Sequence, residues 1–356
     1  MVLLALALAG ILAYLDKLVW VFVLLYSVLL ALALAAAWTW WCCRHLRLDR
    51  DGGGQPRVVG EQLLEKFRLQ NDSGLPIRLA EVRDRSPLAD QRPRRVISLA
   101  PRQIVTWESR VHLGERGRFE LGPTELRLSD PFGLFQRRLL FPARETLLVH
   151  PQLVTVAARS LPGADPTPRR RKRDGGRYIP EVAHDLLVLL DLNHLRHRGD
   201  GADSTLEYAL TVAGSVARAA AQQGRSVALT ASGEPTWRIP AGRGEIHERH
   251  LFDYLAVAGT SGRRPFAELV SLEMAAWGGR GGTVLITPDR DSEWVAAAAA
   301  ATRPGERPLA VLLDPVEPGM TAFRLPAQWR LVLDLWVVHH ADDLLRLDLG
   351  HGREVV

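Results

Sequence analysis

The pattern of hydrophobic and polar positions divides the chain into three stretches. Residues 2–43 are almost entirely apolar, and residues 51–152 contain short segments in which apolar and polar side chains alternate. From residue 185 onward, continuous apolar runs alternate with segments of helical period. These three patterns are typical of membrane helices, half-buried strands and α/β domains, respectively. The sequence therefore predicts a multidomain protein with a transmembrane α-hairpin (1–43), an all-β sandwich (51–152) and a doubly wound α/β domain (185–350).

The apolar N-terminal stretch is interrupted only by Asp16 and Lys17. Residues 18–43 contain 26 positions without a charge, and a helix of that length, at about 1.5 Å per residue, exceeds the roughly 30 Å hydrocarbon core. Residues 2–15 give a shorter apolar segment, so we expect a hairpin with Asp16 and Lys17 at its tip. A cleavable signal peptide is the competing interpretation, although no basic segment precedes the apolar stretch and a second, longer one follows.

Aromatic and basic residues follow the second apolar segment. They are Trp38, Trp40, Trp41, Arg44, Arg47 and Arg50. An aromatic belt followed by arginines is typical of the cytoplasmic end of a membrane span. The sequence therefore predicts a protein of the cell inner (plasma) membrane, in contact with the lipid bilayer, whose soluble domains lie in the cytoplasm.

The amino-acid composition excludes few classes of binding partner. The chain has 356 residues, 47% of them hydrophobic and 24% charged, which is ordinary for folded domains. The net charge of +5 by itself indicates no specific nucleic-acid partner. The only cysteines are the adjacent Cys42 and Cys43, so neither a disulfide framework nor a thiolate metal site is expected in the soluble part.

The most distinctive motif lies in the second half of the predicted sandwich. Residues 115–135 read ERGRFELGPTELRLSDPFGLF, and His150 and Pro151 follow. We expect Asp130 to cap a tight Pro-Phe-Gly turn whose Phe132 and Phe135 fill the core, because aspartate commonly accepts hydrogen bonds in such turns. These motifs resemble the bacterial domain-of-unknown-function 58 family, whose members are membrane-anchored. The Tyr-x-Pro-Gly-Asp and Ile-His-Trp segments that mark this family are missing from the chain, so no activity that they support is transferred.

A segment rich in proline, glycine and arginine (161–184) is the predicted linker between the two soluble domains. It contains an uninterrupted basic run, which consists of Arg169, Arg170, Arg171, Lys172 and Arg173. Such a run is a candidate interaction site for anionic lipid headgroups, RNA or an acidic protein surface. A solvated linker without a partner is the alternative interpretation.

The C-terminal half has the element order of an open α/β sheet. Strands are expected at 186–191, 227–230, 283–287, 309–313 and 335–338, and helices at 204–223, 247–257, 266–277 and 293–301. This order, together with the residues at 189–191, 204–205 and 284–288, resembles a von Willebrand factor A-like domain of the same family. Metal-binding members of that superfamily carry Asp-x-Ser-x-Ser after the first strand.

The resemblance implies which residues would form a metal site. Asp191 matches the first position of that motif, whereas Asn193 and Leu195 stand in place of the two serines. Thr260 and Asp289 match the distant threonine and acid. These oxygen ligands suit Mg²⁺, so Asp191, Asn193, Thr260 and Asp289 are the candidate metal site. A degenerate, metal-free interaction face is the competing interpretation.

Other clusters give no established pattern. His194, His197, Asp200 and Asp203 share a loop, but their spacing matches no metal motif. A phosphate-binding loop, a nucleophile elbow and a zinc-protease helix are all missing from the sequence, so an enzyme is not predicted. The leading hypothesis is a membrane-tethered scaffold or adaptor, for which the resemblance implies a MoxR-type AAA ATPase as partner. A cation-dependent ligand receptor and, third, a hydrolase with an unrecognised site are the alternatives.

Overall fold

The computed structural model describes residues 2–88, 94–142, 145–157, 160–163, 185–314 and 326–346. These residues form two compact units. The first comprises Met1–Pro56, Glu61–His112 and Phe119–Leu147, and the second comprises Arg57–Gly60, Leu113–Arg118 and Leu148–Val356. The predicted basic run at residues 169–173 lies outside the described residues.

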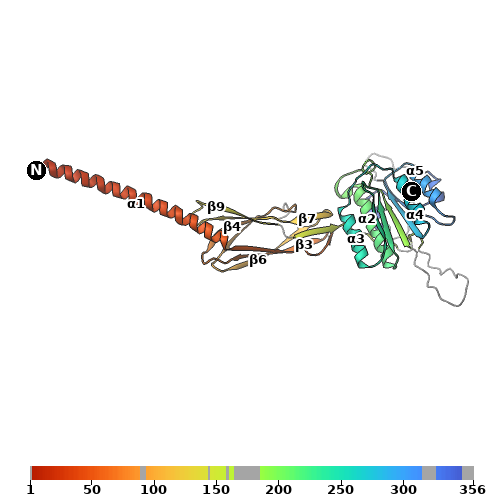
Figure 1. Ribbon diagram of the computed structural model, residues 1–356, viewed down its shortest axis with the longest axis horizontal. Coiled ribbons are helices and arrows are strands. Elements are labelled where there is room, and N and C mark those ends of the chain that lie inside the picture. Colours follow the sequence, from red (N-terminus) through yellow and green to blue (C-terminus); the bar gives the residue numbers. More distant parts are fainter. Residues whose placement is uncertain are drawn as a thin grey trace. The chain divides into compact units, whose positions relative to one another are not determined.

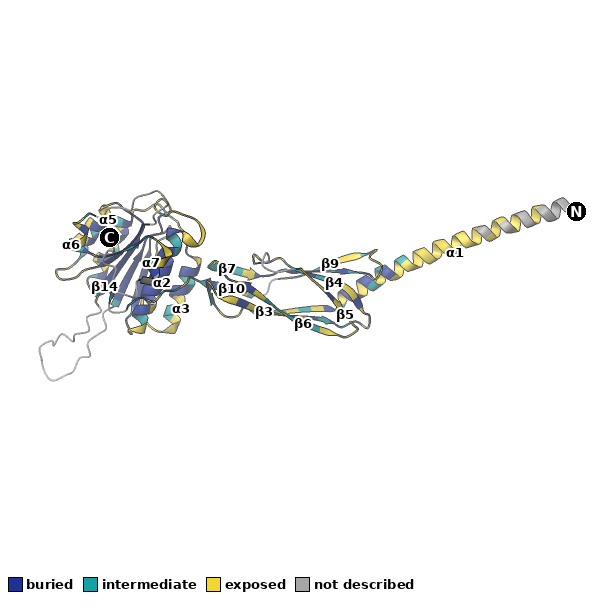
Figure 2. Cartoon of the chain, turned by 180° about the vertical axis from the view of Figure 1, so that it is seen from behind, coloured by how far each residue is buried: buried dark blue, intermediate teal, exposed yellow. Residues whose placement is uncertain are grey.

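The first unit begins with one long helix, α1 (Val2–Arg44) (Figure 1). The predicted hairpin is therefore wrong, because the helix continues through Asp16 and Lys17. Neither residue breaks a helix, and no proline or glycine lies beside them to make a turn. The segment Tyr14–Arg44 is long and apolar enough to cross a membrane, and almost none of its most apolar part is covered by the rest of the chain. Exposed apolar side chains line α1, most densely between Leu18 and Leu34, and Trp40 and Trp41 near its end are exposed as well (Figure 2).

Two antiparallel sheets follow in a sandwich-like arrangement. One has the order β1-β3-β6 and the other the order β5-β4-β8-β9. The strands are β1 (Leu46–Asp51), β3 (Gln62–Asn71), β4 (Ile77–Asp84), β5 (Arg95–Leu99), β6 (Ile104–His112), β8 (Thr124–Ser129) and β9 (Gln136–Phe141). The alternation expected from the sequence is clearest in β3, where every second side chain is buried. Leu46 and Leu69 of the first sheet share a core with Leu126 and Leu128 of the second, and Cys42 of α1 completes it.

The turn between β8 and β9 differs from the sequence prediction in one respect. Asp130 caps the turn as expected, since its carboxylate accepts hydrogen bonds from the backbone N–H groups of Phe132 at 2.9 Å and Phe135 at 2.6 Å. Phe132, however, is 74% exposed and Phe135 is only partly buried, so neither fills the core as predicted. The tight turn reverses the chain beyond the end of the sheet, so no core is within reach of its apex.

A short sheet with the order β2-β10-β7 is formed by β2 (Arg57–Val58), β10 (Glu145–His150) and β7 (Gly117–Leu121). Within the second unit, Val149 and His150 of β10 pair in parallel with β2. The side chain of His150 also contacts the carboxylate of Asp253 at 2.8 Å. These contacts connect the short strand segments to the α/β part of that unit.

The α/β part of the second unit is built on a six-stranded sheet with the order β13-β12-β11-β14-β15-β16. The strands are β11 (Asp185–Leu190), β12 (Val227–Ala231), β13 (Trp237–Gly242), β14 (Gly281–Thr287), β15 (Leu309–Leu313) and β16 (Asp334–Val338). All neighbours are parallel except β12 and β13. The central strands are buried on both faces, which is why they read as continuous apolar runs.

Helices cover both faces of this sheet (Figure 2). One face carries α2 (Thr205–Gln222), α3 (Glu245–Val257) and α7 (Ala341–Arg346). The other carries α4 (Phe266–Trp277), α5 (Glu293–Ala301) and α6 (Trp329–Val332). Alternate residues of β11 enter the two cores, Val188 on the first face and Leu189 on the second. This arrangement is the doubly wound α/β domain that the sequence predicts.

Candidate functional site

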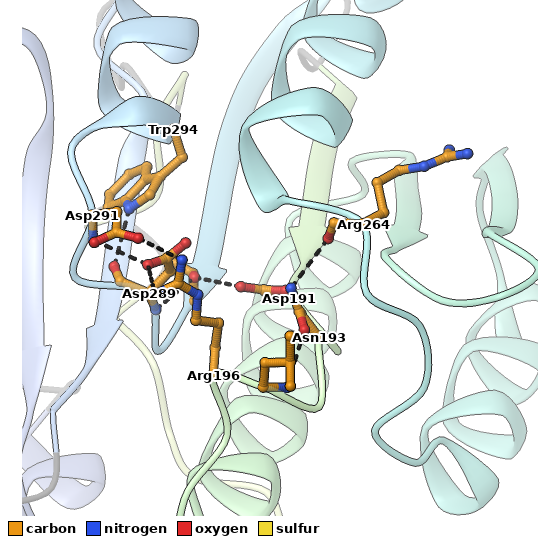
Figure 3. A network of polar contacts seen from close by, with 9 residues as sticks. Asp191, Asn193, Arg196, Arg264, Asp289, Asp291 and Trp294 are labelled. Atoms are coloured by element: carbon orange, nitrogen blue, oxygen red, sulfur yellow. Dashed lines mark hydrogen bonds and ion pairs between the residues drawn. The ribbon is translucent and has the colours of Figure 1, made fainter.

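Two strand ends meet in the middle of the six-stranded sheet. β11 pairs with β12 on one side and with β14 on the other, so the chain order reverses between β11 and β14. Open α/β sheets bind their ligands beyond the carboxyl ends of the strands at such a point. Asp191 follows β11 directly, and Asp289 comes shortly after β14. The structure therefore brings these two predicted site residues to the same edge of the sheet (Figure 3).

The carboxylate of Asp191 is fully buried and accepts three hydrogen bonds. Its Oδ1 accepts from the backbone N–H of Asn193 at 3.1 Å and from the hydroxyl of Ser232 at 3.0 Å. Its Oδ2 accepts from the hydroxyl of Thr287 at 2.7 Å. Because Ser232 follows β12 and Thr287 ends β14, the carboxylate joins the ends of three adjacent strands.

Burial also changes the protonation of this carboxyl group. Desolvation raises the pKa of Asp191 to about 6, and this effect outweighs the hydrogen bonds from Thr287, Asn193 and Ser232, which favour the charged form. The nearby charge of Asp289 raises the pKa of Asp191 further. Burial is likewise the main reason that the pKa of Asp289 is raised. A carboxyl group must lose its proton to bind a metal ion, and the raised pKa moves that loss closer to neutral pH.

The side-chain oxygens of the other two predicted ligands form no hydrogen bond with the Asp191 carboxylate. Asn193 accepts a hydrogen bond from the backbone N–H of Leu195 at 3.0 Å through its Oδ1, and its Nδ2 donates to the backbone oxygen of Arg264 at 3.3 Å. Thr260 is exposed and is not among the partners of the Asp191 carboxylate. Among the described residues, no group of three or more His, Cys, Asp or Glu side chains is arranged to hold a metal ion. The side-chain oxygens of Asp191 and Asn193 are bonded to protein donors and do not point to a common position for Mg²⁺.

An arginine closes the solvent side of the Asp289 carboxylate (Figure 3). Arg196 lies 3.4 Å from an oxygen of Asp289 and also forms an ion pair with Asp291. Beneath them, the indole N–H of the fully buried Trp294 donates to the backbone oxygen of Asp289 at 3.0 Å. The loop after β14 is therefore bound at Asp289 by Trp294 on the core side and by Arg196 on the solvent side.

A polar pocket of about 600 Å³ borders the same loop within the second unit. His194, His197 and Thr260 lie in its wall. His197 contacts the backbone oxygen of Asp191 at 2.8 Å through Nε2 and the hydroxyl of Thr205 at 3.0 Å through Nδ1. Burial lowers the pKa of His197, which favours the neutral ring. This histidine therefore holds the loop to the start of α2.

Two charged groups of the pocket, Arg116 and Glu207, are paired with each other. Arg116, from the sequence motif, forms an ion pair with Glu207 of α2 and donates to the backbone oxygen of Leu255 in α3 at 3.0 Å. Desolvation lowers the pKa of Arg116 to about 10. Because its guanidinium is buried and bound to two helices, Arg116 joins α2 to α3.

Sequence reasoning missed the two hydroxyls that bind Asp191. Ser232 and Thr287 lie at the carboxyl ends of β12 and β14, the two neighbours of β11. The signal for Thr287 was its place at the end of a buried run, and the signal for Ser232 was its place directly after the next strand. Their significance depends on the strand order, which a single sequence does not specify.

Comparisons with known proteins add little to this description. No family model and no curated protein matches the sequence. A CARDB domain from Pyrococcus furiosus, in complex with di-metal ions, aligns with 29% of this chain and 86% of its own length, at 12% identity and a TM-score of 0.23. A complex of zinc 2-glycoprotein and prolactin inducible protein from human seminal plasma aligns with 29% of this chain and 92% of its own, at 8% identity and a TM-score of 0.23. TM-scores of this size carry no inference about the fold or the function of this chain.

Proposed function

We propose that the chain is a membrane-tethered, non-enzymatic adaptor that presents a von Willebrand factor A-like domain to a protein partner. Two features support that domain assignment. One is the strand order β13-β12-β11-β14-β15-β16 with β13 antiparallel, and the other is the resemblance of the sequence motifs to the domain-of-unknown-function 58 family. The preceding sheets would then be an immunoglobulin-like sandwich. The same resemblance implies that the partner is a MoxR-type AAA ATPase.

The observation that carries this proposal is that protein donors occupy both carboxylate oxygens of the buried Asp191. The carboxylate at the position where such sheets bind ligands is committed to Ser232, Thr287 and Asn193. A catalytic or metal site needs groups that are open to a substrate or ion, whereas a docking face needs a rigid edge with exposed side chains around it. Leu195, in the loop after Asp191, is 66% exposed and lies beside the ion pairs of Arg196. We infer that this loop is the docking face.

The apolar surface of α1 supports the tether. Large apolar side chains such as Leu24 and Leu30 are more than half exposed on it, and exposing a surface of this extent to water is unfavourable. A bilayer is the environment that would cover it. The aromatic and basic residues that follow favour a cytoplasmic location for both soluble domains.

Co-purification from detergent-solubilised membranes tests the docking face. We expect the full-length chain to recover a MoxR-type AAA ATPase, identified by mass spectrometry, in the presence of ATP. Leu195→Asp should reduce this recovery at least about tenfold, because a charge in the centre of an interface is strongly unfavourable. The matched control is Leu272→Asp on α4, where the leucine is 57% exposed on another part of the domain. Recovery of no such ATPase, or equal loss in both variants, would refute the proposal.

A divalent-cation receptor remains the alternative function, using Asp191, Asn193, Thr260 and Asp289. Calorimetry of the full-length chain with Mg²⁺ or Mn²⁺ distinguishes the two functions. The adaptor proposal predicts no specific heat of binding, because the Asp191 oxygens are engaged by protein donors. Saturable binding that is lost in Asp191→Asn would favour the receptor.

A further inference from the structure

The turn between β8 and β9 exposes two large apolar side chains in the first unit. Phe132 is 74% exposed and Leu134 is 59% exposed. Asp130 holds the turn through backbone hydrogen bonds, and those bonds lower the pKa of its carboxyl group despite its burial. The two apolar side chains are therefore presented on a structured turn. Adjacent exposed apolar side chains of this kind commonly mark an interaction surface.

Strand pairing places this turn at the end of the sandwich where α1 enters. The backbone N–H of Asp72, in the loop between β3 and β4, donates to the oxygen of His45 at 2.8 Å, directly after α1. β4 starts from that loop, and its Ala80 pairs with Leu128 near the end of β8. The turn after β8 therefore lies at the same end as His45. Figure 1 shows β9 beside the last turns of α1, and α1 contacts both β8 and β9.

The helix sets the depth of this turn relative to a bilayer. Residues 18–38 of α1 would extend about 31 Å, which matches the hydrocarbon core and places its boundary near Trp38. The sandwich already covers α1 at Ala35 and Thr39, which are 3% and 1% exposed. Strands that pack on this part of α1 must end at the level of the lipid headgroups.

The exposed charges around the turn are basic. Arg137 and Arg138 follow the turn on β9 and both are exposed, but Arg138 is already paired with the buried carboxylate of Glu125 at 2.9 Å. Arg102 is exposed in the β5–β6 loop, and its backbone N–H donates to Ser73 at 3.2 Å, which places it at the same end. The acid Asp72 at this end is paired with Arg47 at 2.9 Å. Exposed arginines beside exposed apolar side chains fit an anionic membrane surface.

We propose that this turn is a second membrane contact, in which Phe132 and Leu134 enter the interfacial region of the bilayer that α1 crosses while Arg102 and Arg137 bind anionic headgroups. The inference rests on the proposed membrane tether. The consequence is that the sandwich is fixed against the membrane surface by two points, the helix and the turn. It would then not rotate freely about α1.

Photocrosslinking in nanodiscs tests the contact on the full-length chain. The photoreactive residue p-benzoylphenylalanine replaces Phe132, or Leu140 as the matched control. Leu140 is 60% exposed in the same hairpin, and it pairs with Glu125 toward the other end of β8. It lies about 13 Å along β9 from the first residue after the turn. We expect lipid adducts at position 132 to be about tenfold more abundant than at position 140, because only the turn would reach the acyl chains.

A probe at a third position, on α1, distinguishes failure of the turn contact from failure of the membrane tether. Leu24 is 67% exposed on α1 and should give lipid adducts if the helix spans the bilayer. Adducts at position 24 with equal, low yields at positions 132 and 140 would overturn the inference and leave the tether intact. A lack of adducts at position 24 would remove the tether and, with it, the bilayer that the turn is proposed to contact.

Lipid composition tests the role of the arginines. Hydrogen exchange of residues 130–135 should be slower in nanodiscs that contain phosphatidylglycerol than in nanodiscs of phosphatidylcholine alone. The combined substitutions Arg102→Gln and Arg137→Gln should abolish this difference, and Phe132→Ser should speed exchange in both lipids. Exchange that is independent of lipid charge in the wild-type chain would contradict the binding of anionic headgroups.

Discussion

Replacing Asp191 by asparagine should remove a pH dependence of stability that the buried network creates. The pKa of Asp191 is raised from 3.8 to about 6 in the folded protein, so the folded state binds this proton more tightly than the unfolded chain. The stability that Asp191 contributes is therefore fully present below about pH 4 and is lost as the pH rises through about 6. At about 1.4 kcal/mol per pKa unit, the total change is about 3 kcal/mol, of which about 2 kcal/mol falls between pH 4.5 and 7.5.

Asparagine has nearly the same shape and does not titrate. Its amide can donate to the hydroxyl of Thr287, which can rotate to accept, so the contacts between strand ends are kept. Relative to wild type, the free energy of unfolding of Asp191→Asn should therefore increase by about 2 kcal/mol between pH 4.5 and 7.5.

Hydrogen exchange of β11 and β14 peptides in the full-length chain measures this difference, after correction for the intrinsic exchange rates at each pH. EDTA is present so that trace cations cannot contribute. The control is Asp334→Asn, whose carboxylate is 59% exposed and pairs with Arg307 at 3.1 Å. An exposed pair of this kind should change stability by less than about 1 kcal/mol at either pH. An equal difference between Asp191→Asn and wild type at both pH values would refute the reasoning, because Asp191 would then titrate as an ordinary aspartate.

Three further predictions concern other parts of the chain. In urea unfolding, Gly281→Ala should destabilise the α/β domain by about 3 kcal/mol, because the new Cβ would lie 1.8 Å from the backbone oxygen of Asp185. The control Gly54→Ala, whose Cβ would have nothing within 4 Å, should cost less than about 0.5 kcal/mol in the same assay. Trp294→Ala should cost about 4 kcal/mol in the same assay, because it removes a fully buried ring and the hydrogen bond to Asp289, and a cost below about 1 kcal/mol would contradict that packing. A protease-cleavable tag before α1 should be cut only from the side of the membrane opposite the soluble domains, since α1 is one helix, and cleavage from the same side would instead indicate a hairpin.

Much of the α/β domain follows from local patterns. The predicted helices at 266–277 and 293–301 match α4 and α5, and the predicted start at Ser204 is confirmed by its hydroxyl, which accepts from the backbone N–H of Glu207 at 3.2 Å. The buried strands were also found, because a strand covered on both faces leaves a continuous apolar run. β13 was missed because it is an exposed edge strand with Pro240 in its sequence, and it lacks that run.

The errors occur where the hydrophobic pattern alone does not decide the structure. A charged pair in an apolar stretch is unusual, so Asp16 and Lys17 predict a turn, but both residues are compatible with a helix and α1 continues through them. The apolar side chain of Phe132 predicts a core position, but the turn capped by Asp130 leaves it exposed. At the candidate site, Asp191 was recognised from its place after β11. The hydrogen bonds that its carboxylate accepts from Ser232 and Thr287 depend on which strands are neighbours, and the sequence alone does not predict that order.

Flotation of membranes tests the membrane tether, on which the account depends, most directly. Cells that express the full-length chain are lysed without detergent, and the membranes are washed with alkaline carbonate and floated through a sucrose gradient. We predict that the chain floats with the lipid and that a variant without residues 1–34 stays in the soluble fractions, because the exposed apolar surface of α1 is what the bilayer covers. A full-length chain that remains soluble and does not float would contradict the tether and the membrane contact of the β8–β9 turn.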